Sequence, residues 1–158
     1  METTGLNDSD QVRFRFANRD DVPSIVALLA EDTLGQVREQ GDMDQYFTAF
    51  TEMSAQDGNK YLLAIDSRDA VVGCVQITLV PGLSRAGMKR ALLEGVRVSD
   101  NVRGQGVGRL MLAEAHEIAV RQGCGIAQMT SDISREDALR FYKSLGYVDS
   151  HFGLKLAL

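Results

Sequence analysis

The centre of the sequence carries a strand, a glycine-rich turn, a helix and a second strand in close succession, and this unit constrains the fold more than any other feature. Alternating side chains predict the first strand over Leu92–Ser99. The turn follows, with glycines at positions 104, 106 and 108. An apolar stripe at helical spacing then predicts a helix that ends near Gly123, and Ile126–Thr130 is predicted as the second strand. Elements in this order indicate a mixed α/β domain.

Further strands and helices are expected on both sides of this unit. Strands are predicted over Arg13–Asn18, Tyr61–Asp66, Ala70–Val80, Tyr147–Val148 and Phe152–Leu158. Helices are predicted from Asp20 to about Glu31, over Tyr46–Met53 and over Glu136–Leu145. The stretches 35–45 and 81–90 are expected to be loops.

Composition narrows the class of protein. The chain has 158 residues, enough for one domain with a core that needs no disulfide or metal. Its 17 basic and 22 acidic residues give a net charge of −5, which argues against broad binding to nucleic acid or to anionic membranes. No apolar stretch reaches the ~20 residues of a membrane helix. Residues 1–11 are expected to be a disordered tail, and residues 12–158 a single domain.

The cysteine and histidine counts argue against a metal site. Two cysteines and two histidines leave too few ligands for a zinc site built from those residues alone. Cys74 and Cys124 are instead expected to be reduced thiols in the core of a cytoplasmic protein.

The central turn has the composition of a diphosphate-binding loop. Its sequence is Arg103-Gly104-Gln105-Gly106-Val107-Gly108-Arg109. Glycines let backbone N–H groups approach a phosphate closely, and the start of the following helix adds unpaired donors and a positive dipole end. The arginines at both ends of the turn could pair with further phosphate oxygens.

Other phosphate-binding motifs fit this turn less well. A P-loop requires Gly-x-x-x-x-Gly-Lys-Ser/Thr, which the sequence does not contain. A dinucleotide-binding fingerprint needs a third glycine where Arg109 stands, although Asp132 could serve as its ribose-binding acid. A nucleotide-binding α/β module and a turn that binds nothing stay open as alternatives.

Three segments in register resemble the GNAT-type N-acetyltransferases. Arg103-x-x-Gly106-x-Gly108 matches the Arg/Gln-x-x-Gly-x-Gly/Ala signature of that family. The strand containing Glu94 precedes the signature at the right distance, and Ala138–Tyr147 resembles the family's Ala-x-x-Phe-Tyr-x-x-x-Gly-Phe element. The resemblance covers nearly the whole chain from Val12. It implies a mixed sheet of six to seven strands, flanked by about four helices, in which two central parallel strands splay apart.

The resemblance also implies where acetyl-CoA binds. The pantetheine arm would lie along the main chain of Val96, Arg97 and Val98, and Gly95 could host a bulge that causes the splay. The pyrophosphate would contact the amides between Arg103 and Arg109. One position departs from the family: Arg135 stands where many members have a cofactor-contacting asparagine.

Direct transfer of the acetyl group to an amine is the reaction that the resemblance implies. Glu94 is the candidate base, because it is expected to share a strand face with Val96 and Val98. Tyr142 is the candidate acid that protonates the leaving thiolate. The N–H group of Val96 could polarise the acetyl carbonyl.

The acceptor is expected to be a small-molecule primary amine. The ending around His151 resembles aminoalkylphosphonate acetyltransferases within the family. Acetylation of protein lysines or N-termini is the alternative within the class, and an inactive CoA-binding module is the alternative outside it. No metal is expected, and a homodimer is possible because many family members form one.

Overall fold

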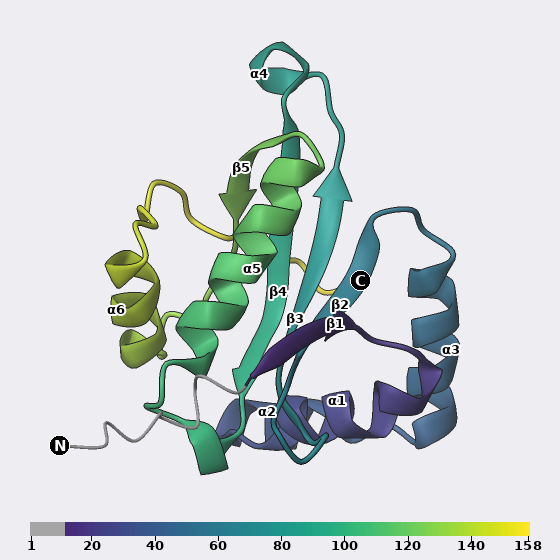
Figure 1. Ribbon diagram of the computed structural model, residues 1–158. Helices are drawn as coiled ribbons and strands as arrows, with labels where there is room; N and C mark the ends of the chain where they lie inside the picture. The colour runs from purple at the N-terminus through teal and green to yellow at the C-terminus, as the bar shows by residue number, and fades with distance from the viewer. Residues whose placement is uncertain (1–11) are drawn as a thin grey trace, which may run out of the picture. The chain divides into compact units, whose positions relative to one another are not determined.

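The computed structural model describes residues 12–158, and these form a mixed α/β fold (Figure 1). The strands are β1 (Arg13–Phe16), β2 (Asn59–Ile65), β3 (Val71–Val80), β4 (Lys89–Val98) and β5 (Cys124–Gln128). The helices are α1 (Val22–Ala30), α2 (Thr33–Arg38), α3 (Met43–Ser54), α4 (Ser84–Gly87), α5 (Val107–Arg121) and α6 (Glu136–Ser144). Short 3-10 turns, η2 (Arg19–Asp21) and η3 (Asp100–Val102), precede α1 and the glycine turn. The predicted tail 1–11 lies outside the described residues.

The five described strands form one sheet in the order β1-β2-β3-β4-β5. The first three pairings are antiparallel and β4 pairs with β5 in parallel, as the crossover through α5 requires. The mixed sheet predicted from the sequence is therefore confirmed.

The two closing strands predicted at residues 147–148 and 152–158 are absent from the described structure. Phe152, Leu154 and Leu156 alternate as in a strand, yet each is more than 80% exposed. Alternation marks a segment that can form a strand, but a strand also needs a backbone partner, which this segment lacks in the structure. The sheet thus has five described strands instead of six to seven.

Helices cover both faces of the sheet. Ile25 and Leu28 of α1 pack on Leu63 and Cys74, which are paired across β2 and β3. The next pair along the two strands, Ala64 and Gly73, faces the other way, and the Met111 sulfur of α5 lies close to Gly73 there. The fully buried side chains on these strands and on α5 form the core between the layers.

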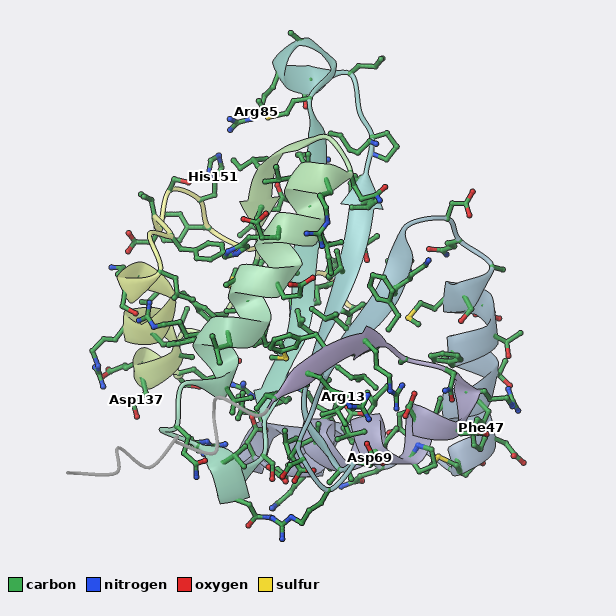
Figure 2. The ribbon with its side chains drawn as sticks, in the orientation of Figure 1. Arg13, Phe47, Asp69, Arg85, Asp137 and His151 are labelled. Atoms are coloured by element: carbon green, nitrogen blue, oxygen red, sulfur yellow. The ribbon has the colours of Figure 1, made fainter. Side chains whose placement is uncertain are left out.

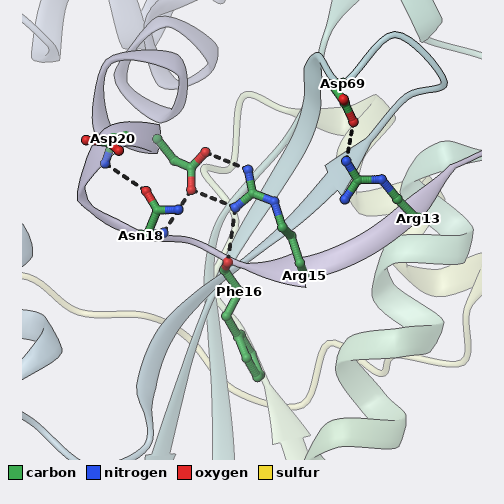
Figure 3. Close-up of polar contacts among 7 residues, drawn as sticks. Arg13, Arg15, Phe16, Asn18, Asp20 and Asp69 are labelled. Carbon is green, nitrogen blue, oxygen red and sulfur yellow. Dashed lines mark hydrogen bonds and ion pairs between the residues drawn. The ribbon is translucent and has the colours of Figure 1, made fainter.

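Asp20, Asp21 and Pro23 predicted a helix start, and the structure has one there. Asn18 and Asp21 form the capping box of η2, which leads directly into α1, and Pro23 lies in the first turn of α1. Both carboxylate oxygens of Asp21 also accept hydrogen bonds from the Arg15 guanidinium, at 2.7 and 2.8 Å (Figure 3). The acids that predicted a helix start therefore also join α1 to β1.

Glycines in the left-handed region end two of the helices. Gly123 has φ 77° and follows α5, as predicted. Gly146 has φ 95° and follows α6, where the amides of Gly146 and Tyr147 donate to the carbonyls of Lys143 and Tyr142. This pair of hydrogen bonds is the Schellman arrangement, which satisfies carbonyls at the end of a helix.

The stretch 35–45, predicted as a loop, is partly helical. Its first residues belong to α2, whose N-cap is Asp32; the Asp32 carboxylate accepts a hydrogen bond from the Gly35 amide at 2.6 Å. Gly35 is required here because a Cβ atom would lie 1.9 Å from the Leu29 carbonyl oxygen. This short helix was not predicted because its sequence is polar and has no apolar stripe. It is formed by capping and close packing instead.

Two further features lie outside the sheet: a contact between η2 and α3, and the turn between β3 and β4. The Arg19 guanidinium lies 4.4 Å from the centre of the Phe47 ring and so joins η2 to α3. Figure 2 labels Phe47 on α3. At the tip of the hairpin between β3 and β4, Arg85 and Ala86 adopt left-handed backbone angles inside the single turn α4. Lys89 and Arg90, predicted in a loop, are the first residues of β4.

Contacts divide the described chain into a larger unit that ends at Gln128 and a smaller unit, Met129–Leu158. In the smaller unit the rings of Tyr142 and Tyr147 meet edge to face, with centroids 6.1 Å apart. Burial raises the pKa of Tyr147 to about 12. Lys143 and Asp149 form an ion pair at 2.8 Å, which lowers the pKa of Asp149. The single domain predicted over 12–158 stays a prediction.

Candidate active site

A bulge in β4 determines the geometry of the candidate site. Gln76 pairs with Glu94, whereas Cys74 pairs with Arg97, so β4 carries one residue more than β3 between these pairs. Gly95 lies in this interval with φ 58°. A two-against-one arrangement with a glycine in the left-handed region is a β-bulge, and it bends the strand that carries the extra residue. The bulge expected at Gly95 is thus present.

The bulge changes which residues share a face. Side chains of directly paired residues lie on the same face, so Glu94 and Arg97 face the side of Gln76 and Cys74. Val98 pairs with Gly73 and so faces the opposite side. The prediction that Glu94 and Val98 share a face is therefore wrong, because an uninterrupted alternation cannot account for an extra residue.

The parallel pairing of β4 and β5 ends early. It runs from Lys89 and Cys124 to Leu92 and Gln128, where β5 stops, while β4 continues to Val98. The main chain of β4 beyond Leu92 therefore has no partner on β5. The pairing thus stops in the region where the family resemblance implied a splay. The main chain of Val96, Arg97 and Val98 has no β5 partner there, although the Val96 carbonyl accepts a hydrogen bond from the Arg97 guanidinium at 2.9 Å.

The glycine turn presents backbone donors to solvent. Gly104 and Gly106 have φ 80° and 85°, and a Cβ atom on either would meet nothing within 4 Å. Gly106 is the N-cap of α5 and no side chain caps that helix. The first amides of α5, at Val107 and Gly108, lack intrahelical acceptors. Open space, uncapped amides and a helix dipole fit a diphosphate group.

The side chains of the turn have different surroundings. Val107 is 1% exposed and anchors α5 in the core, and the Gln105 amide donates to the Val102 carbonyl at 3.3 Å. Arg103 pairs with Asp100 at 2.7 Å, with both side chains more than 60% exposed. Arg109 is exposed on the first turn of α5. Both arginine side chains are thus exposed beside the turn. Because an exposed ion pair contributes little to stability, Arg103 can exchange Asp100 for another anion at little cost.

Arg97 has a structural partner that the sequence did not reveal. Its side chain extends to the joint between α1 and α2, where its Nε lies 3.6 Å from the Asp32 carboxylate. Beside it, the Glu31 carboxylate accepts from the Ser99 hydroxyl at 3.4 Å and from the Asp100 amide at 3.1 Å. Two consecutive acids thereby hold the end of β4, immediately before the glycine turn.

Glu94 lies on the sheet face that also carries Tyr61 and Gln76. Gln76 pairs with Tyr61 on one side and with Glu94 on the other, so the three residues form a row across β2, β3 and β4. Glu94 is exposed. From the end of α2, the Glu39 carboxylate accepts a hydrogen bond from the Tyr46 hydroxyl at 2.9 Å. Sequence reasoning missed Tyr61, because its alternation marked it only as a strand residue.

Tyr142 and Arg135 belong to the smaller unit. Tyr142 lies in the middle of α6, and Arg135 is the N-cap residue of that helix. Both make contacts within the structure. They therefore occupy the helix on which the sequence placed them.

The two cysteines are poor nucleophiles. Cys74 is buried, its thiol donates to the Gly95 carbonyl at 3.6 Å, and burial raises its pKa to about 12. Burial also raises the pKa of Cys124. The expectation of a core thiol is confirmed for Cys74, whereas Cys124 is only partly buried at the start of β5. A raised pKa disfavours the thiolate, which is the reactive form.

Three other kinds of site are conceivable for the described residues: a surface hollow, a metal site and a membrane-spanning helix. A hollow of about 420 Å³ over α3 contains no predicted site residue and is lined by Asp42, Asp44, Gln45, Thr48, Ala49 and Glu52. Within residues 12–158, no three His, Cys, Asp or Glu side chains gather as metal ligands would. No helix in the same range has both the length and the apolar character needed to cross a membrane.

Comparison with known proteins gives the same result as the geometry. Residues 22–147 match the model of the acetyltransferase (GNAT) family. The chain is 31% identical over 144 residues to the aminoalkylphosphonate N-acetyltransferase of Salmonella typhimurium, covering 91% of this chain and 90% of that protein.

Two solved structures illustrate the range of similar folds. One is a protein from Bacillus halodurans described as a transcriptional regulator, with 39% identity, a TM-score of 0.88 and coverage of 93% of this chain and 99% of that one. The other is an aminoglycoside N-acetyltransferase in complex with CoA, with 14% identity, a TM-score of 0.77 and coverage of 93% and 94%. Since the family match spans more than half of the chain, this protein belongs to the GNAT family and is an acetyl-CoA-dependent N-acetyltransferase.

Proposed function

We propose that this enzyme transfers the acetyl group of acetyl-CoA to the primary amine of a small molecule. The observation that carries the proposal is the β4 bulge at Gly95, which lies between the exposed Glu94 and the stretch of β4 main chain that has no β5 partner. The Salmonella typhimurium relative, named for aminoalkylphosphonates, supports a small amine as the acceptor.

The glycine turn would hold the diphosphate of acetyl-CoA. The amides of the turn other than that of Gln105, which already donates to the Val102 carbonyl, would bind the phosphate oxygens, with Arg103 and Arg109 supplying positive charge at the two ends. The edge of β4 from Val96 to Val98 would pair with the pantetheine amides. Arg135 would bind a phosphate or a pantetheine amide in place of the asparagine of other members.

Glu94 and Tyr142 would handle the protons of the reaction. The amine nitrogen forms a bond to the carbonyl carbon, the carbon–sulfur bond breaks, and the electron pair leaves with sulfur. Of the three protons of the starting ammonium, one stays on the amide nitrogen. A second leaves through Glu94 to solvent, directly or through a water. The third replaces the proton that Tyr142 gives to the thiolate, so the tyrosine is neutral again at the end of the reaction. The N–H group of Val96 would polarise the carbonyl.

Two measurements in sequence test this function. A thermal-shift titration with acetyl-CoA, CoA and NAD tests the glycine turn, because a ligand that binds the folded state raises the melting temperature. Stabilisation by the two CoA species and not by NAD is expected. Thiol release with 2-aminoethylphosphonate, simple alkylamines and a lysine-containing peptide then tests the acceptor. Faster release with the peptide than with every small amine would contradict a small-molecule acceptor.

A further inference from the structure

The Tyr61 side chain lies beside the β4 bulge at Gly95. It stands in one row with Gln76 and Glu94 on the same face of the sheet. Its hydroxyl would lie 3.3 Å from a Cβ atom on Gly95, and Leu29 would lie 3.4 Å from the same atom. The phenol therefore extends over the bulge, on the side where Glu94 is exposed.

The Tyr61 hydroxyl has no hydrogen-bond partner within residues 12–158, in contrast to the polar groups around it. Gln76 donates to the Asn59 side-chain oxygen at 2.8 Å, and Thr78 donates to the same oxygen at 3.3 Å. The Tyr46 hydroxyl donates to Glu39 at 2.9 Å. The hydroxyl oxygen is also not among the fully buried unpaired atoms of the described residues, so it is accessible to a partner supplied by a ligand.

The charges that act on Tyr61 define what that partner can be. Burial raises its pKa above the ordinary value for a phenol, and Glu39 and Glu94 raise it further, while Arg97 acts in the opposite direction. The phenol therefore stays neutral, and in this form it can both donate and accept hydrogen bonds. The carboxylates of Glu39 and Glu94, which both act on the Tyr61 phenol, favour a ligand whose nitrogen carries protons that it can donate.

We propose that the Tyr61 hydroxyl binds the acceptor amine beside Glu94 and orients its lone pair toward the thioester. The inference rests on the proposed function, because it requires an amine in this site. One N–H of the amine donates to the phenol oxygen while another proton leaves through Glu94, so the nitrogen lone pair is directed away from both. Tyr61 is thus an acceptor-binding residue, distinct from the acid and the base.

The test compares Tyr61→Phe with the wild-type enzyme. The change removes one hydroxyl and leaves the ring that packs in the sheet. Losing one hydrogen bond to the amine corresponds to a roughly tenfold weaker affinity. Binding of 2-aminoethylphosphonate and of butylamine to the enzyme–CoA complex is measured by calorimetry, and KM for each amine and for acetyl-CoA is measured by thiol release. We expect the amine constants to rise about tenfold while the acetyl-CoA constant stays within twofold.

A matched variant controls for the loss of a hydroxyl from this face. Thr78→Val removes a hydroxyl that already has a protein partner, and its amine affinity should stay within twofold of wild type. Unchanged amine affinity in Tyr61→Phe would overturn the inference and leave the proposed function standing. If wild-type enzyme bound neither amine in the presence of CoA, both the small-amine function and the Tyr61 assignment would fall. An equal rise in the acetyl-CoA constant would also overturn it, since it would indicate a general structural defect.

Discussion

The Arg15 guanidinium holds both carboxylate oxygens of Asp21, and the Asp21 side chain is only 10% exposed (Figure 3). The same carboxylate accepts from the Asn18 amide at 2.8 Å. One acid thus joins β1 to α1, the helix whose far end carries Glu31 at the joint with α2. The position of α1, and of α2 that follows it, therefore depends on this ion pair.

We expect Asp21→Asn to destabilise the fold by about 2 kcal/mol, since charged hydrogen bonds contribute about 1.5 to 3 kcal/mol. The Arg15 hydrogen bonds lower the pKa of Asp21 below that of an unfolded chain. The stabilisation is therefore complete above the unfolded pKa, about 3.9, and is lost as the pH falls through the folded pKa. Urea denaturation at several pH values measures both effects. The gap between wild type and variant should be constant from pH 6 to 8, should begin to narrow near pH 4, and should close once the pH is below the folded pKa of Asp21. A gap that did not narrow at all as the pH fell would show that the ion pair is not its source.

Gly106→Asp should abolish CoA binding. An aspartate at the N-cap of α5 would cap the helix with its own carboxylate and place negative charge where the phosphates bind. The matched control is Gly123→Asp at the other end of α5, which has a similar positive φ and equally open space. Both variants should lose some stability, but only Gly106→Asp should lose the thermal shift with CoA. Loss in both, or in neither, would contradict the assignment of the turn.

Glu94→Gln should lower kcat by about 10²-fold to 10³-fold, the range expected for loss of a general base. It should also change the low-pH limb of the pH profile of kcat, because a general base acts in its unprotonated form. The acetyl-CoA binding constant should stay the same, because Glu94 belongs neither to the glycine turn nor to the β4 edge at Val96–Val98 that we propose for acetyl-CoA. Glu117→Gln, an exposed acid on α5, provides the control for charge. A wild-type pH profile in Glu94→Gln would remove Glu94 from its proposed role.

Tyr142→Phe should lower kcat by at least tenfold while changing KM for acetyl-CoA less than twofold, if its hydroxyl protonates the thiolate. The phenylalanine ring keeps the edge-to-face contact with Tyr147, so α6 should stay folded. Esters of CoA analogues with a more acidic thiol need less help from an acid, and the variant should recover with them. A defect of equal size for both leaving groups would exclude this role.

The sequence predicted the parts of the fold that depend on local chemistry. Gly123 and Gly146 end their helices, and the turn at Gly104 and Gly106 lies where expected, because positive φ strongly favours glycine. The phase of β4 beyond Gly95 could not be predicted, since a bulge depends on the partner strand as well. The same holds for Arg97, whose partner Asp32 is distant in sequence.

Tyr61 and α2 were missed for a related reason. The alternation around Tyr61 is the same whether its hydroxyl has a partner or not, and only the register with Gln76 and Glu94 places it beside the bulge. Helix α2 depends on an aspartate cap and on Gly35 approaching the Leu29 carbonyl, neither of which produces periodicity. Periodicity reports burial of a face, so elements formed by capping and close approach escape it.

Gly95→Ala tests whether the bulge itself is required. At φ 58° an alanine costs about 1 to 2 kcal/mol, and its methyl would also press on the Tyr61 hydroxyl at 3.3 Å. Gly87→Ala is the matched control, because Gly87 has φ 77° but open space around it, in the turn between β3 and β4. Both variants should lose stability in urea because of backbone strain, and Gly95→Ala should lose somewhat more because its methyl also contacts the Tyr61 hydroxyl. Only Gly95→Ala should also lose acetyl transfer, because relief of its strain would shift Glu94 relative to the strand edge. If turnover fell equally in both, the loss would follow from strain alone and the position of the bulge would have no special role.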